Sequence, residues 1–156
     1  MSKPQPWKIA LAWLAVVAWA GMVWGLGTDP LSHSATSRYL EPLATWLFPD
    51  LTPVEKRQLL HFVRKFAHVF EYAVLAGLLL RAATLSWRRS ALLAGLFALG
   101  AVSAMAVADE WRQAQSSART GSMGDVALDI GGGLLAIAIG LALERRYRTS
   151  QPPQVG

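Results

Sequence analysis

Three side chains suited to acid–base or ionic chemistry recur at helical spacing inside a strongly apolar stretch. Lys65, His68 and Tyr72 are separated by three and four residues, so on an α-helix they share one face, with Glu71 beside them. An ionisable group in hydrocarbon costs roughly 2.5–3.5 kcal/mol for Lys, Arg or Asp. An interfacial position explains Lys65 and Tyr72. The side chains of His68 and Glu71 are too short to reach water from inside the membrane. We therefore expect them to face other helices in a polar site.

A second set of polar residues occurs at the ends of two later apolar stretches, at the same predicted edge of the membrane. "DEWRQAQSSARTGSMGD" closes one stretch and "DVALDIGGG" opens the next. Asp125 also fits a capping box with Ser122, whereas Asp129 lies one turn deeper and has no such explanation. We predict that both sets enclose one polar pocket. Its residues are Lys65, His68, Glu71, Tyr72, Asp109, Glu110, Gln113, Arg119, Asp125 and Asp129.

Three functions fit this composition. In the favoured one, Arg119, Lys65 and protonated His68 bind the anionic head of an envelope lipid or cell-wall precursor. The second is a membrane hydrolase or transferase acting on a lipid-linked substrate. There His68 would be the general base, oriented by Glu71 or Glu110. In the third, the cluster only holds helices together in a non-catalytic interaction protein. The sequence leaves open whether the protein is an enzyme.

Known catalytic signatures do not occur in the chain: it has no HExxH, GxSxG or P-loop motif. A metal site is chemically possible with nitrogen and oxygen ligands. Its ligands would come from His68, Glu71, Asp109 or Asp129. No local spacing supports such a site, so neither a metal nor another cofactor is predicted.

Four apolar segments must position these residues. Each is long enough to cross a membrane, which takes about 20 residues; they are residues 9–26, 66–85, 91–108 and 126–143. With 53% hydrophobic residues in a chain of 156, one soluble domain could not bury so much apolar surface. The absence of Cys excludes disulfides and thiolate metal sites. We therefore predict an all-α polytopic membrane protein. It would be a four-transmembrane-helix bundle in a single domain (residues 1–149) with a disordered polar tail (150–156).

The connection after the first span is predicted to carry a short helix on the outer membrane surface. Apolar residues recur there at helical spacing, namely Tyr39, Leu40, Leu43, Trp46 and Leu47. "TPVE" then predicts a helix start, because Thr52 and Glu55 form a capping box and Pro53 suits the first turn. One helix from about Pro53 to Leu85 would exceed the membrane, so its first three turns should project outside.

The distribution of basic residues predicts the orientation in the membrane, and a row of small residues predicts a helix-packing face. The Arg-dense segments "RAATLSWRRS" and "ERRYR" favour a cytoplasmic N-terminus and a cytoplasmic C-terminus. Basic residues punctuate apolar runs, which is a pattern of membrane lipid contact and not of nucleic-acid binding. Gly132, Ala136 and Gly140 recur every four residues, a face that lets helices approach closely and offers a possible homo-oligomer contact.

Two stretches resemble the VanZ-like membrane protein family, over about residues 63–133. "RKFAHVFEYAVLAGLLL" is similar to its K-x-x-H-x-x-x-Y-x-x-L block, and "DEWRQ…ARTGSMGDVALDIGGG" is similar to its second block. By position, the family's polar residues correspond to Lys65, His68, Tyr72, Glu110, Gln113, Arg119, Asp125 and Asp129.

The resemblance implies a small multi-pass protein of the bacterial cytoplasmic (inner) membrane. Its founding relatives lower susceptibility to the glycopeptide teicoplanin, and the resemblance supplies no reaction. The chain departs from the pattern at Arg112, where many members have His, and at Ala118, where Gly is frequent. An activity that depends on that histidine would be absent here.

Overall fold

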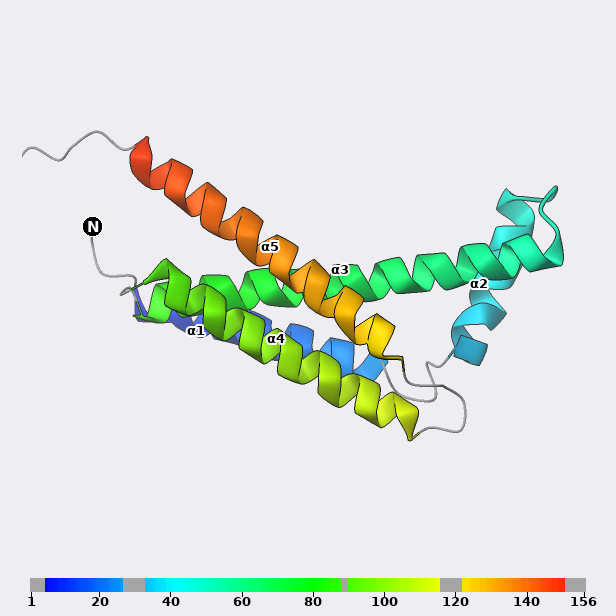
Figure 1. The fold of residues 1–156 in the computed structure, drawn as a ribbon, viewed down its shortest axis with the longest axis horizontal. Coiled ribbons are helices and arrows are strands. Elements are labelled where there is room, and N and C mark those ends of the chain that lie inside the picture. The colour runs from blue at the N-terminus through cyan, green and yellow to red at the C-terminus, as the bar shows by residue number, and fades with distance from the viewer. Residues whose placement is uncertain (1–4, 27–32, 88–89, 116–121, 151–156) are drawn as a thin grey trace, which may run out of the picture.

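The computed structural model describes residues 5–26, 33–87, 90–115 and 122–150. Within these residues the chain is helical throughout, apart from short turns and ends (Figure 1). The helices are α1 (Pro6–Leu26), α2 (His33–Leu47), α3 (Pro53–Trp87), α4 (Ala91–Ala114) and α5 (Met123–Thr149). Four of them, α1, α3, α4 and α5, are long and apolar enough to cross a membrane. The predicted all-α fold with four membrane-spanning helices is confirmed.

The long helix α3 is the centre of the bundle and contacts each of the other helices. Figure 1 shows the start of α1 and the end of α5 at the same end of the molecule, as an even number of spans requires. At the opposite end the first turns of α3 extend beyond α4 and α5, and α2 lies beside them. The side of the membrane on which each end lies stays a prediction.

The start of α3 follows directly from its sequence. The backbone N–H of Thr52 donates to Glu55 Oε2 at 2.7 Å, and the Glu55 N–H donates to Thr52 Oγ1 at 3.3 Å. This reciprocal pair is the predicted capping box, and Pro53 takes the first helical position. At 1.5 Å per residue the helix is about 50 Å long, longer than the hydrocarbon of a membrane. The projecting first turns of α3 follow from this length.

The predicted short helix between the first two spans is present as α2. Its Ala44 is buried, whereas Leu43, Trp46 and Leu47 are exposed, so one face packs inward and an apolar face remains open. This pattern suits a helix lying on a membrane surface. That location stays a prediction.

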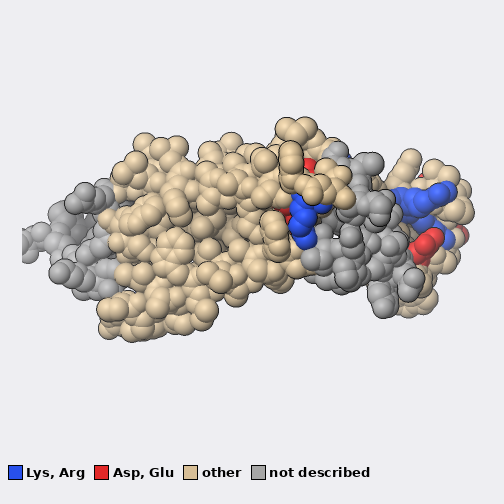
Figure 2. All heavy atoms as spheres, turned by 90° about the horizontal axis from the view of Figure 1, so that it is seen from below, with Lys and Arg blue, Asp and Glu red and all other residues tan. Residues whose placement is uncertain are grey.

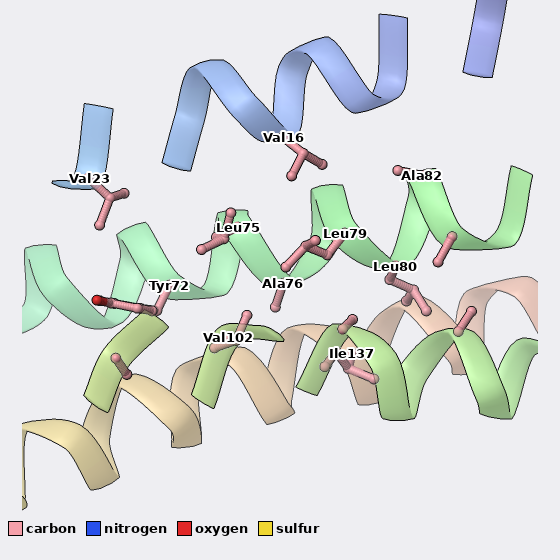
Figure 3. Close-up of a cluster of buried hydrophobic side chains, with 14 of the residues drawn as sticks. Val16, Val23, Tyr72, Leu75, Ala76, Leu79, Leu80, Ala82, Val102 and Ile137 are labelled. Atoms are coloured by element: carbon pink, nitrogen blue, oxygen red, sulfur yellow. The ribbon is translucent and has the colours of Figure 1, made fainter. Parts of the chain in front are cut away.

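Alanines are frequent among the buried residues between the long helices, and Figure 3 shows Ala76 and Ala82 among the larger side chains of this core. Ala76, Ala98 and Ala106 are almost completely buried, which allows close helix approach. A β-carbon on Gly132 would lie 2.7 Å from the backbone oxygen of Val69 on α3. The glycine face of α5 therefore packs within the chain, and a homo-oligomer through the same face would have to displace α3.

The outer surface of the bundle is apolar over most of its length. Large side chains such as Leu14, Leu92 and Leu135 are exposed, as expected for helices that contact lipid. Figure 2 shows that, on the face it presents, described charged side chains gather toward the end where α3 projects. The polar chemistry of this face is therefore concentrated at one end.

Candidate functional site

A small polar pocket lies where α3, α4 and α5 meet, near the start of α5. It has a cavity volume of ≈ 20 Å³, room for about one water-sized group. Four of its residues come from α3, two from α4 and three from α5. They are His61, Arg64, Lys65, His68, Glu110, Gln113, Asp125, Leu128 and Asp129.

Two ionic contacts join α3 to α5 across the pocket. Lys65 Nζ lies 2.8 Å from Asp125 Oδ1, and His68 Nδ1 lies 3.9 Å from Asp129 Oδ2. The first pair is about one-third exposed, whereas the Asp129 side chain is only 6% exposed. Because the partners are three residues apart on α3 and four apart on α5, each contact lies about one helical turn from the other.

Asp125 does not act as a capping residue for α5. Ser122 occupies the N-cap position but its side chain makes no capping hydrogen bond. The backbone N–H of Ser122 donates instead to Glu110 Oε1, which ties the start of α5 to the end of α4. The capping-box interpretation of Asp125 is therefore wrong, and its carboxylate pairs with Lys65 instead.

Asp109 supports the pocket from behind and does not line it. Its buried carboxylate accepts a hydrogen bond from Arg112 Nη2 at 2.5 Å and another from Gln113 Nε2 at 2.7 Å. The Arg112 guanidinium in turn lies over the Trp24 ring, 4.5 Å from its centroid. This network joins α1 to α4 and fixes the amide of Gln113, which does line the pocket.

Glu71 and Tyr72 lie outside the pocket lining. Tyr72 is completely buried in the apolar core that also contains Val23, as Figure 3 shows. Its hydroxyl has no hydrogen-bond partner among the described residues. The backbone carbonyl of Glu71 accepts a hydrogen bond from the Trp19 indole at 3.0 Å, which places this turn of α3 beside α1.

The structure thus brings six of the ten predicted site residues together in one lining. These are Lys65, His68, Glu110, Gln113, Asp125 and Asp129. Glu71, Tyr72 and Asp109 lie behind or beside the pocket, and Arg119 lies outside the described residues.

His61 and Arg64 were not among the predicted site residues, yet both line the pocket. The signal was present in the sequence, because His61 precedes Lys65 by four residues and Arg64 precedes His68 by four. Such spacing places each pair on one helix face. Arg64 forms no ion pair within the part of the chain that the structure describes. Among the described residues no group of three or more potential metal ligands converges on one point.

The sequence was compared with known families, curated proteins and solved structures. A family model described as VanZ/LLP1 matches residues 10–144, which include all of α3 and α4, most of α1 and α5, and every pocket residue. No curated protein and no solved structure matches the chain.

Proposed function

The chain belongs to the VanZ/LLP1 family, and from this premise we propose that its pocket binds the phosphate of an envelope lipid or lipid-linked cell-wall precursor. Binding would take place at the outer face of the bacterial cytoplasmic membrane. By the family-level association, such binding would contribute to teicoplanin tolerance.

The carrying observation is that two of the three carboxylates in the lining, Asp125 and Glu110, have close partners, while Arg64 has no carboxylate partner among the described residues. Asp125 pairs with Lys65, and Glu110 accepts the Ser122 N–H. Asp129 lies within ionic range of His68. The three acids of the lining would by themselves repel an anion, but the Lys65–Asp125 ion pair has no net charge and so reduces this repulsion. Among the described lining residues, Arg64 is the permanent cation without a carboxylate partner.

Arginine is well suited to this role. Its guanidinium donates two parallel hydrogen bonds to phosphate oxygens and is more weakly hydrated than an ammonium. Lys65, one residue further along α3, lies at the predicted membrane boundary, where lipid phosphates occur. The neighbouring His61 can add a further donor when protonated. Arg64 and a protonated His61 are therefore the cations of the lining that an anion would meet, with the paired Lys65 beside them.

Short-chain phosphatidic acid titrated into the purified protein by calorimetry tests this proposal. We expect Arg64→Gln to weaken binding about tenfold or more, the value of a charge-assisted hydrogen bond. The matched control is Arg57→Gln, the same change two turns earlier on α3. Among the described residues, Arg57 hydrogen-bonds to the carbonyl of Pro53 and does not line the pocket. Wild-type affinity in Arg64→Gln would refute the proposal.

An enzyme acting on a lipid-linked substrate is the second candidate, favoured by the His68–Asp129 pair. The 3.9 Å separation of the two side chains exceeds the 2.6–3.2 Å or so of a catalytic hydrogen bond, although such bonds are often longer without substrate. Incubation with a polyprenyl phosphate substrate separates the candidates. Turnover that is lost in His68→Ala would establish the enzyme, whereas binding without turnover supports the binding protein.

A further inference from the structure

Asp129 is an unusual residue in the pocket lining, because its buried carboxylate accepts no hydrogen bond among the described residues. Its side chain is 6% exposed, and its Oδ2 lies 3.9 Å from His68 Nδ1, beyond hydrogen-bond distance. Its Oδ1 is inaccessible to solvent and has no hydrogen-bond partner among the described residues. A buried anionic oxygen in this state is costly unless a donor is supplied. The other oxygen, Oδ2, is not among the solvent-inaccessible atoms, so a donor in the pocket can reach the Asp129 carboxylate there.

The size of the cavity restricts which donor fits. A volume of ≈ 20 Å³ accepts about one water-sized group. A primary ammonium has this size, whereas a phosphate with four oxygens, or a trimethylammonium group, does not. A phosphate is therefore too large for the enclosed space, and only a small group can enter it.

The remaining lining also suits an ammonium, which has three N–H donors and no acceptor. Gln113 is 6% exposed and its Nε2 donates to Asp109 Oδ2. This contact leaves the Gln113 side-chain carbonyl as an acceptor at the pocket. Glu110 supplies a second carboxylate, of which one oxygen accepts the Ser122 N–H.

We propose that the pocket recognises a phospholipid whose phosphodiester carries a primary amine, with the ammonium bound by Asp129 and the phosphate by Arg64. This inference rests on the proposed function, since it assigns the second half of the headgroup whose phosphate the same site binds. The headgroup class is thus phosphoethanolamine-like: anionic at the mouth and cationic in the enclosed part.

A series of short-chain lipids that differ only in headgroup tests the inference on the wild-type protein. Phosphatidylethanolamine, phosphatidylcholine and phosphatidylglycerol share the phosphodiester but end in ammonium, trimethylammonium and hydroxyl groups. We expect the ethanolamine lipid to bind about tenfold or more tightly than either of the others. Equal affinities would overturn the inference and leave the proposed function standing. Absence of binding by all three would contradict the proposed function itself.

Asp129→Asn provides the second arm, because it keeps the side-chain shape and removes the charge. We expect this variant to lose the preference for the ethanolamine lipid over phosphatidylglycerol. The matched control is Asp50→Asn, the same change in the exposed turn between α2 and α3, which should keep the preference. A folded Asp129→Asn protein that still prefers ethanolamine would overturn the inference. If this variant does not fold, the wild-type headgroup series decides.

Discussion

Replacing Gly132 by alanine should separate α5 from α3 immediately below the pocket. A β-carbon at this position would lie 2.7 Å from the Val69 backbone oxygen and 2.8 Å from Val69 Cγ1. Ordinary contacts between heavy atoms begin at about 3.5 Å, so the two helices must move apart by several tenths of an ångström. A backbone oxygen within α3 cannot rotate away, so the strain falls on the helix packing.

The size of the effect follows from two opposing terms. Over-packing a close contact typically costs about 1–3 kcal/mol, and the obstacle here is main chain, which favours the upper half of that range. Alanine in place of glycine within a helix returns about 1 kcal/mol. We therefore expect Gly132→Ala to lose about 1–2 kcal/mol in unfolding free energy.

The neighbouring Gly131 offers a matched control, because a β-carbon there has no atom within 4 Å. Gly131→Ala should keep or slightly raise stability, by up to about 1 kcal/mol. Reversible unfolding in mixed micelles of dodecyl maltoside and sodium dodecyl sulfate measures both variants. If Gly132→Ala proves as stable as Gly131→Ala, the close approach of α3 and α5 at this level is wrong.

Three further changes test other contacts. Arg112→Gln leaves the buried Asp109 carboxylate without its cation, so we expect a loss of about 3 kcal/mol in the same micelles; a loss under about 1 kcal/mol would contradict the role of this pair. Thr52→Ala removes the capping box and should cost about 1 kcal/mol. The cost should appear as faster amide hydrogen exchange in the first turn of α3, and unchanged exchange would count against the cap. Because the chain has no Cys, Ser150→Cys and Gln115→Cys can be labelled singly with a membrane-impermeant maleimide. They lie at opposite ends of the bundle, with Ser150 predicted inside, so labelling of both from one side would disprove the four-span topology.

The positions of the helices could be predicted from the sequence because local signals define them. "TPVE" marks the start of α3 through contacts within four residues. Long uncharged runs mark the spans, since hydrocarbon excludes charge over a length fixed by the membrane. The ends were predicted less well: α4 continues to Ala114, six residues past the predicted end of its span at 108. The end of the apolar run shows where the chain leaves the hydrocarbon, but the helix α4 continues beyond that point through polar residues.

The side chains around the pocket could be predicted only in part. Helical spacing shows which residues share one face of a helix, but it does not show which neighbouring helix that face contacts. Glu71 lies about 60° around α3 from His68, and this rotation places its turn beside α1, where Trp19 bonds to its carbonyl. Tyr72 shares the face of His68 but lies one turn deeper, in the closely packed core. The contact of Arg112 with Trp24 joins residues far apart in the chain, and no local pattern relates them.

Packing and polar contacts together specify one register between α3 and α5. A slide of one turn would bring Ala136 to the position of Gly132, where a β-carbon meets the Val69 backbone. The same slide would place Asp129 opposite Lys65 and remove His68 from its carboxylate. Neither pattern alone is decisive, since exposed ion pairs contribute little and small residues tolerate several registers. In combination they exclude the alternative, because the displaced register both brings a β-carbon against the Val69 backbone and separates His68 from the Asp129 carboxylate. The contact of Gly132 with Val69 therefore also determines which charged side chains of α3 and α5 face each other in the pocket.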